Sequence, residues 1–347
     1  MELPVTRYYG SKRKLVERIW EELENRHLEY QSFLDVFGGT GIMSYNMLKH
    51  GKDVVYNDIF TFNCKIAEAL LASPRGVFTN QDAAQLILPV EGREYQHFIE
   101  EIFRGIYYRN DEDRTIDTVT QNILHLPQEQ QASAYYILFQ SCIIKRPFNL
   151  FHRRNLNLRE NHTESNFGNY VTWEKGFETL FRQFTEELNQ FQFQQIPNVE
   201  IVNHSALECP NVADLVYIDT PYFNKKSSAV SYHSRYHFLE GLVFYNDIPN
   251  NVNYNKVNRE IEIHKSSEFE SKANYLNDLN ELLDHYPDSI IVMSYTSEGY
   301  PSIEELEAQL RRHKQHVEVI FFGKYNFALN RSNQNRQEVL FIAYNKK

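Results

Sequence analysis

This chain has little cysteine, no long apolar run and no excess of positive charge. Only three of its 347 residues are cysteines, Cys64, Cys142 and Cys209, and none belongs to a CxxC pair. This argues against a disulfide framework or a structural zinc site and indicates a reducing compartment. No apolar stretch approaches the roughly 20 residues of a membrane-spanning helix, and the N-terminus lacks the pattern of a signal peptide. We therefore expect a cytoplasmic protein with no membrane partner.

The charged residues are unevenly distributed along the chain. The formal net charge is −10 at pH 7, a sum that by itself speaks against a nucleic-acid partner. Basic residues nevertheless gather near the N-terminus, between residues 145 and 159, and in the C-terminal region. Local distribution matters more to a partner than the sum. A single basic run is usually a solvated face, so charge alone leaves both interpretations open.

Strand-like and helix-like segments alternate at both ends of the chain. Residues 32–37 and 53–57 are apolar strand segments, and residues 42–49 between them have helical spacing. The order strand, turn, helix, strand predicts a parallel, doubly wound sheet. Further strands are expected at 199–203, 215–218, 289–294, 317–322 and 339–344.

The middle of the chain has a different character. It is helical and polar, with a basic and aromatic centre. The sequence thus predicts an α/β fold with a doubly wound, mostly parallel, Rossmann-like sheet and an inserted, mainly helical module. We expect residues 1–62 and 196–347 to form the split sheet domain, and residues 63–195 to form the insertion.

A glycine turn follows the first predicted strand, in the segment Phe37-Gly38-Gly39-Thr40-Gly41. Glycines allow a tight turn and close approach of a ligand to the backbone. Asp58 ends the next strand, where an acid commonly accepts hydrogen bonds from a ribose. The full dinucleotide fingerprint is missing, so an adenosine without a pyrophosphate fits best, and S-adenosylmethionine meets that description. The alternative is an ordinary turn with Asp58 as a helix cap.

A second motif follows the buried strand at 215–218. The residues are Asp219, Thr220, Pro221 and Tyr222. A carboxylate acceptor beside an aromatic ring can hold a planar amine while its nitrogen attacks an electrophile.

Several segments, in their order along the chain, resemble the Dam-like, α-group DNA N6-adenine methyltransferases. The tetrad of that family is usually Asp-Pro-Pro-Tyr and matches residues 219–222, with Thr220 in place of the first proline. The other matching segments are RYYGSKRKL (7–15), DVFGGTG (35–41), YHFLE (236–240), SYTSEG (294–299) and RQEVLF (336–341).

The resemblance implies a class I methyltransferase fold that uses S-adenosylmethionine and no metal. It also implies methyl transfer to adenine N6 in duplex DNA after the base is flipped out. Asp219 and the Thr220 carbonyl would accept the amine hydrogens, Pro221 would complete the catalytic tetrad, and Tyr222, with Phe223 beside it, would stack on the base. The residues expected to bind the cofactor are Tyr8, Lys12, Asp35, Phe37, Gly39, Gly41, Asp58 and Asp219.

The resemblance further implies double-stranded DNA as a partner, and it leaves open whether a cognate restriction endonuclease accompanies the chain. The insertion is the expected target-recognition module. Core packing is the alternative role for Phe148 and Phe151. The residues expected to contact DNA are Lys145, Arg146, Asn149, Arg153, Arg154, Asn155 and Arg159.

The sequence leaves the substrate, the turnover, one segment and the oligomeric state open. The substrate could instead be N4 of cytosine, RNA or a protein amide, which the same fold can accommodate. Because Thr220 departs from the family pattern, a DNA-binding module with weak or no turnover is a second alternative. The Asn-rich stretch at about 245–271 has no role that the sequence defines, and the oligomeric state is not predicted.

Overall fold

The chain folds into two units, which are described separately. The computed structural model describes residues 3–4, 12–161, 170–210, 212–221, 223–224, 231–263, 267–323 and 337–345. We call Ser11–Ile59, Pro197–Ser231 and Ser266–Lys347 the sheet unit, and Met1–Gly10, Phe60–Ile196 and Tyr232–Lys265 the helical unit.

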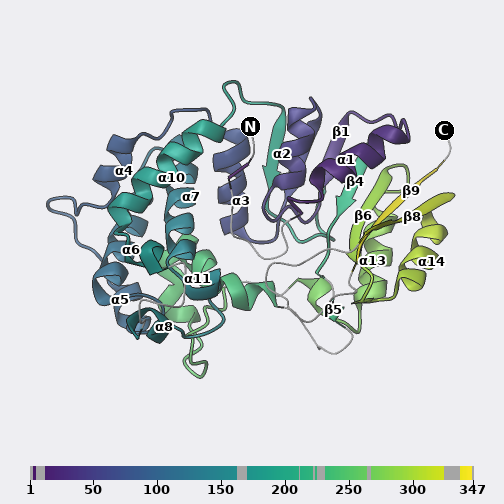
Figure 1. Cartoon of the computed structure of the whole chain (residues 1–347). Coiled ribbons are helices and arrows are strands. Elements are labelled where there is room, and N and C mark those ends of the chain that lie inside the picture. The colour runs from purple at the N-terminus through teal and green to yellow at the C-terminus, as the bar shows by residue number, and fades with distance from the viewer. Residues whose placement is uncertain are drawn as a thin grey trace. The chain divides into compact units, whose positions relative to one another are not determined.

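The sheet unit contains a seven-stranded sheet of order β3-β2-β1-β4-β6-β9-β8 (Figure 1). Strands β3, β2, β1, β4 and β6 are parallel, and β9 runs antiparallel to both β6 and β8. The predicted doubly wound, mostly parallel α/β fold is confirmed. The strands are β1 (Ser32–Asp35), β2 (Asp53–Asn57), β3 (Val199–Val202), β4 (Leu215–Ile218), β6 (Ile290–Thr296), β8 (His316–Phe322) and β9 (Glu338–Tyr344), while β5 (Phe223–Asn224) and β7 (Gly299–Tyr300) form a separate pair.

Strand β4 lies at the centre of the sheet, and all four of its residues are buried. A strand covered on both faces is apolar throughout rather than alternating, which explains its Leu-Val-Tyr-Ile sequence. Its register pairs Asp35 of β1 with Tyr217. On one face, the rings of Phe33 and Tyr217 stack with centroids 6.3 Å apart.

Helices cover both faces of this sheet. Helices α13 (Tyr275–Asp284) and α14 (Ile303–His313) bury leucines in the same apolar cluster as Leu34 and Val216. Helices α1 (Val16–Asn25) and α2 (Ile42–Lys49) pack together outside that cluster, with α2 against β1 and β2 (Figure 1). A short 3-10 turn, η4 (Glu268–Glu270), precedes α13. The crossover from β1 leads to β2 and that from β4 leads to β6, so the strand order reverses between β1 and β4.

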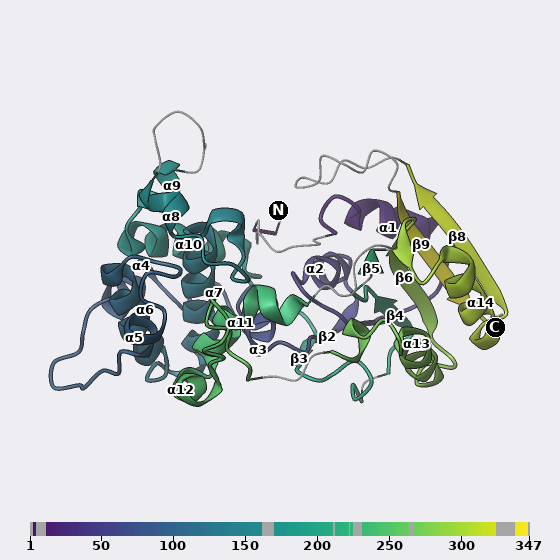
Figure 2. The same cartoon turned by 90° about the horizontal axis from the view of Figure 1, so that it is seen from below.

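The helical unit is built around α7 (Gln128–Ile144), which is buried along nearly its whole length. Apolar residues lie on all sides of the helix, as expected where neighbours surround it, with Ser133, Gln140 and Ser141 buried among them. Figure 2 shows α7 among the other helices of the unit. These are α3 (Thr61–Ala67), η1 (Glu68–Ala72), α4 (Asn80–Leu86), α5 (Phe98–Ile102), α6 (Asn110–Ile123), η2 (Pro147–Asn149), α8 (Asn157–Glu160), α9 (Tyr170–Glu174), α10 (Phe177–Phe191), α11 (Tyr232–Val243), η3 (Tyr245–Asp247) and α12 (Ile248–Asn251).

Residues 232–265 belong to the helical unit, whereas the predicted boundaries placed them with the sheet. The reason is visible in α11. Phe238 packs its ring against those of Phe103 and Phe151, and the Glu240 carboxylate accepts hydrogen bonds from the first backbone N–H groups of α3, at 2.9 and 2.8 Å. These residues follow the tetrad in the sequence, and nothing in the sequence indicated that they contact the helical unit. The division of cofactor binding and target recognition between the two parts remains a prediction.

Within the described residues, no helix combines the length and the apolar character needed to cross a membrane.

Candidate active site and DNA-contacting residues

The predicted catalytic and cofactor-binding residues that the structure describes meet where the strand order of the sheet reverses. Asp35 ends β1, and Asp219 directly follows the neighbouring strand β4. In open α/β sheets ligands bind at the carboxyl ends of the strands at such a reversal. The fold therefore brings together two carboxylates that are 184 residues apart in the sequence.

The glycine turn after β1 is held by close backbone packing. A Cβ atom on Gly38 would lie 2.1 Å from the ring of Tyr56, so only glycine fits there. Gly39 and Gly41 have φ angles of 50° and 70°, a region that favours glycine. The Tyr56 hydroxyl donates to the Gly39 carbonyl at 2.9 Å. The turn is thus a rigid loop at the start of α2.

Asp35 is buried, with one oxygen engaged and one without a partner. Ser44 of α2 donates to its Oδ2 at 2.8 Å, while Oδ1 has no hydrogen-bond partner among the described residues. Burial raises the pKa of Asp35 to about 7, although the hydrogen bond from Ser44 lowers it; the charges of Asp219 and Asp58 raise it further. A buried acceptor without a partner is costly in a finished fold, and it fits a position where a ligand donates.

Asp58 fastens the glycine turn to the end of β2. Its Oδ2 accepts the backbone N–H of Gly39 at 2.8 Å. The side-chain amide of Asn203 donates to the backbone carbonyls of Asp58 and Ile59, at 2.7 and 3.0 Å. The predicted ribose acid is therefore next to the turn, and its backbone is fixed by the segment that follows β3.

Lys12 and Asp219 form an ion pair. Lys12 Nζ lies 2.9 Å from Asp219 Oδ1, with side-chain exposures of 6% and 19%. Backbone hydrogen bonds from Leu15 and Val16 to the Lys12 carbonyl place the lysine at the start of α1. Burial raises the pKa of Asp219, and the Lys12 ammonium opposes this by favouring the carboxylate.

Thr220, the departure from the usual tetrad, is held by its own hydroxyl group. The residue is buried, and its Oγ1 shares a hydrogen bond with the Tyr275 hydroxyl of α13. This bond restrains the loop where the family usually has a proline ring. Pro221 is half-buried. Phe223 is buried in the core, so the expectation that it helps to stack on a base is wrong.

Of the remaining predicted site residues, the structure describes Phe37 but not Tyr8 or Tyr222. Phe37 is half-buried, and its ring meets that of Phe269 edge-on at 5.2 Å. Tyr8 and Tyr222 lie outside the described residues, and their roles remain predictions from the sequence.

The basic segment of the helical unit divides into buried and exposed parts. Lys145, Arg146 and Arg159 are each 1% exposed. Lys145 and Arg159 both pair with Glu112 at 2.8 Å, and Arg146 donates to the carbonyls of the 150–153 loop. Direct DNA contact by these three side chains is therefore not supported, because their charged ends are used inside the unit.

Asn155 is also buried, and its amide donates to the Pro147 carbonyl at 3.1 Å. Arg153 and Arg154 are exposed and Asn149 is half-buried. These last three are the predicted DNA contacts that have access to solvent.

Sequence reasoning missed the residues that hold the predicted ones in place. Ser44 bonds to Asp35 nine residues away, whereas Tyr275 lies 55 residues from Thr220 and Glu112 lies 47 residues from Arg159. A weak signal existed for Ser44, which is a polar residue within the apolar run of α2, but Tyr275 and Glu112 gave none.

The sheet order and the acid-lined glycine turn at its reversal point define a class, the methyltransferases that use S-adenosylmethionine. Within that class, residues 8–309 match the family described as D12 class N6 adenine-specific DNA methyltransferase. The chain belongs to this family and is an S-adenosylmethionine-dependent N6-adenine DNA methyltransferase.

Proteins similar to the chain over its full length include two named methyltransferases. The Type II methyltransferase M2.HphI of Haemophilus parahaemolyticus is 25% identical, over 99% of this chain and 98% of the relative. The Type II methyltransferase M.CviAII of Paramecium bursaria Chlorella virus 1 is 22% identical, over 97% and 98%. Among solved structures, the rRNA methyltransferase aviRa from Streptomyces viridochromogenes covers 95% of this chain and 84% of its own, at 11% identity and a TM-score of 0.31, which supports no argument about function.

Proposed function

We propose that the chain methylates adenine at a short specific sequence in double-stranded DNA as the modification enzyme of a restriction–modification system. Relatives named as type II methyltransferases, matched over nearly their whole lengths, support this proposal. A cognate restriction endonuclease is the partner that such a system needs. The three cysteines are buried and form no disulfide among the described residues, in keeping with a cytoplasmic location.

The Lys12–Asp219 ion pair is the observation that carries the proposed catalytic role. The adenine N6 lone pair is delocalised into the ring and is a poor nucleophile. A carboxylate that accepts one amine hydrogen favours a tetrahedral nitrogen with a directed lone pair, and this aid is electrostatic and positional. Burial raises the pKa of Asp219, and the Lys12 ammonium opposes this by favouring the ionised form that can accept the amine hydrogen.

Thr220 and Tyr222 of the tetrad supply the other proposed contacts with the base. We assign the second amine hydrogen to the Thr220 carbonyl, since the side chain of Thr220 is already bonded to Tyr275. Because the target is stacked inside the duplex, it must be rotated out at a cost of a few kcal/mol. We assign the stacking surface to Tyr222 on the sequence motif.

The residues at the reversal point suit S-adenosylmethionine, which supplies an electrophilic methyl group on a sulfonium when bound. Among the described residues of the site, the carboxylates of Asp58 and Asp219, with Asp35 partly ionised, outnumber the ammonium of Lys12, which favours a cationic ligand. The Asp35 oxygen that lacks a partner is the proposed acceptor for the methionyl ammonium. We assign the ribose to Asp58. The residues that complete the proposed site are Tyr8, Phe37, Gly39 and Gly41.

We assign target recognition to the helical unit. Arg153 and Arg154 are exposed there, and Asn149 is partly so. Arginine suits phosphate and guanine, and asparagine suits adenine.

The test is a mass analysis of nucleosides from duplex DNA incubated with the full chain and S-adenosylmethionine. N6-methyladenine is expected, and sequencing of the methylated DNA gives the target site. A product that contains only N4-methylcytosine would overturn the proposal.

Asp219→Ala probes the assigned acceptor directly. It should lower the single-turnover rate by at least about 100-fold, the scale of a lost transition-state contact. Cofactor affinity measured by calorimetry should largely remain. Asp58→Asn is the matched carboxylate variant, and it should weaken cofactor binding instead. An Asp219→Ala enzyme with normal turnover would mean that the catalytic carboxylate lies elsewhere.

A further inference from the structure

The Asn-rich stretch after α11 forms a hairpin in the helical unit. Residues 251–262, called here the 251–262 hairpin, are closed by an antiparallel bridge between Val252 and Ile261. Backbone hydrogen bonds join Asn253 to Glu260 and Glu262 to Asn251, both at 2.8 Å. The stretch therefore has a defined conformation that its composition did not reveal.

The base of the 251–262 hairpin is anchored in the core of the unit. The Ile261 N–H donates to His237 Nδ1 at 3.0 Å, and the Tyr107 hydroxyl donates to the Asn258 carbonyl at 2.7 Å. The Asn258 side chain donates to the Phe151 carbonyl at 3.2 Å. Burial lowers the pKa of His237, so its ring is neutral and can accept at Nδ1. These buried bonds at Asn258 and Ile261 fix the second strand of the hairpin, and the backbone pairing ties the first strand to it.

The tip of the same hairpin is exposed to an unusual degree. Tyr254 is 56% exposed and Val257 is 79% exposed. The tip forms one wall of a cleft of about 420 Å³ whose other wall comes from residues 101–106 and Arg154. The charged residues that line the cleft are Glu101, Arg104, Arg154, Lys256 and Arg259.

Two of these arginines have no carboxylate partner among the described residues. Arg154 Nε donates only to the Gly105 carbonyl at 3.0 Å. Arg259 donates one hydrogen bond to the Tyr254 carbonyl, and its guanidinium lies 4.9 Å from the centre of the Tyr254 ring. A guanidinium has five N–H donors, so most donors on both groups have no acceptor in the part of the chain that the structure describes.

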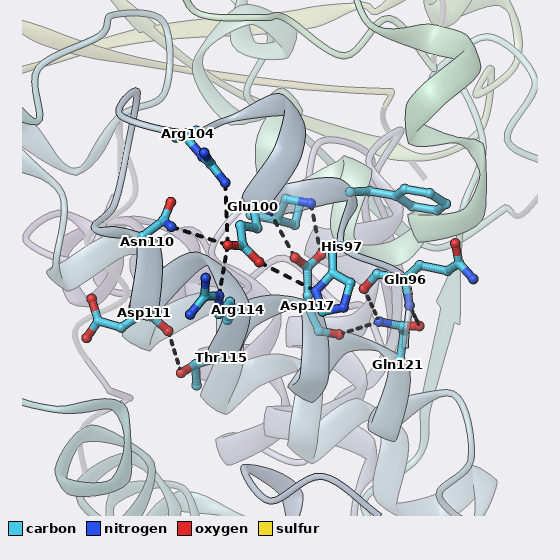
Figure 3. Close-up of polar contacts among 12 residues, drawn as sticks. Gln96, His97, Glu100, Arg104, Asn110, Asp111, Arg114, Thr115, Asp117 and Gln121 are labelled. Atoms are coloured by element: carbon cyan, nitrogen blue, oxygen red, sulfur yellow. Dashed lines mark hydrogen bonds and ion pairs between the residues drawn. The ribbon is translucent and has the colours of Figure 1, made fainter. Parts of the chain in front are cut away.

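The remaining cations are more fully compensated. Lys256 pairs with Glu260 and Glu262 and is not counted as available charge. Arg104 is 3.6 Å from Glu100, which also accepts from Arg114 at 2.8 Å (Figure 3). One carboxylate thus serves two arginines, and the cleft keeps a positive balance even with Glu101 in its lining.

We propose that this cleft, formed by the tip of the 251–262 hairpin with Arg104 and Arg154, binds backbone phosphates of DNA outside the methylated sequence. The proposal rests on the proposed function as a DNA methyltransferase. A guanidinium binds two phosphate oxygens with its planar fork, and the rigid hairpin base keeps the ordering cost of that contact low. The cleft thus gathers an exposed tyrosine, an exposed valine and two arginines that have no carboxylate partner among the described residues in one concave surface.

Arg259→Ala tests the cleft through the salt dependence of DNA affinity in the full-length chain. Each lost phosphate contact should reduce the slope of log K against log salt by about 0.9. At low salt the variant should bind a long duplex about three- to tenfold more weakly. The methylated sequence should stay the same, since phosphate contacts carry no base information. Arg259→Lys keeps the charge and should restore most of the slope.

Arg182→Ala is the matched control, because Arg182 is an exposed arginine of α10 in the same unit. It should bind DNA with the wild-type slope. If Arg259→Ala and Arg104→Ala both keep that slope while the wild-type chain still forms N6-methyladenine, the cleft proposal fails and the proposed function stands. If the wild-type chain methylates no duplex, the proposed function itself fails.

Discussion

The ammonium group of Lys12 lies 2.9 Å from a carboxylate oxygen of Asp219, and both side chains are largely shielded from water. Removing two charges from water costs several kcal/mol. Their mutual attraction offsets this cost only when the geometry of the pair is favourable. A pair of this kind is therefore weak support for stability, and the use of its charge is the better explanation. Asp219 must be ionised to accept an amine hydrogen, and Lys12 favours that form.

Replacing Lys12 by glutamine should move the pH dependence of methyl transfer. Burial already raises the pKa of Asp219, and Lys12 is the group that lowers it. Without the ammonium this pKa rises further, so the carboxylate is lost at a higher pH. The acidic limb of the kcat/KM profile should shift upward in pH, and the rate at neutral pH should fall. Lys12→Arg, which keeps the charge, should leave the limb near its wild-type position.

The same two variants separate catalysis from binding. If Lys12→Gln weakens cofactor affinity but leaves the acidic limb in place, then Lys12 serves the cofactor alone and does not set the charge of Asp219. Calorimetry with the cofactor and a pH series on the same preparations give both answers.

The hydroxyl pair of Thr220 and Tyr275 should show a measurable coupling. Thr220→Val leaves the buried Tyr275 hydroxyl without this partner and should cost about 1–3 kcal/mol of unfolding free energy. Tyr275→Phe should cost a similar amount, and the double variant less than the sum of both. A double-mutant cycle by denaturant unfolding measures the difference. Strict additivity would show that the hydroxyl group does not substitute for the usual proline restraint.

The strands, the glycine turn and the tetrad could be predicted because each follows from local pattern. A run such as Leu215–Ile218 is apolar because it is covered on both faces, and Gly38 is fixed by a single close neighbour, Tyr56. Burial of long cationic side chains cannot be read in this way. Lys145 and Arg159 look like surface charges until Glu112, at least 33 residues earlier in the chain, is placed between them.

Glu112→Gln should therefore destabilise the chain strongly. It leaves two buried cations without their carboxylate, which typically costs about 3–5 kcal/mol. Arg109→Ala breaks a partly exposed pair with Glu174 and should cost under about 1 kcal/mol, which makes it the matched control. Equal losses in the two variants, measured by chemical unfolding, would contradict the role of Glu112 as the centre of a buried cluster.

Acid unfolding gives an independent check on the same cluster. Burial raises the pKa of Glu112, but hydrogen bonds and charges from Arg159 and Lys145 outweigh it and lower the pKa from 4.5 to about 2. The group therefore adds stability above about pH 4.5, and this contribution is lost as the pH falls toward 2. The Glu112→Gln variant lacks this ionisable carboxylate at every pH. The difference in unfolding free energy between wild type and variant should therefore narrow as the pH falls from about 4.5 toward 2.

Replacing Phe148 by asparagine should stabilise the chain, whereas the substitutions of Thr220 and Glu112 above should destabilise it. Phe148 has a φ angle of 63° and is followed by Asn149 at 58°, and the residue is 60% exposed. The left-handed region costs an ordinary residue roughly 1–2 kcal/mol, and asparagine tolerates it better. Phe148→Asn should therefore raise the unfolding free energy by about 1 kcal/mol. Phe148→Ala removes the same ring but keeps the backbone cost, so it should stay near wild type. If asparagine proves less stable than alanine, the exposed ring makes packing contacts that outweigh the backbone cost, and the left-handed turn is not a source of strain.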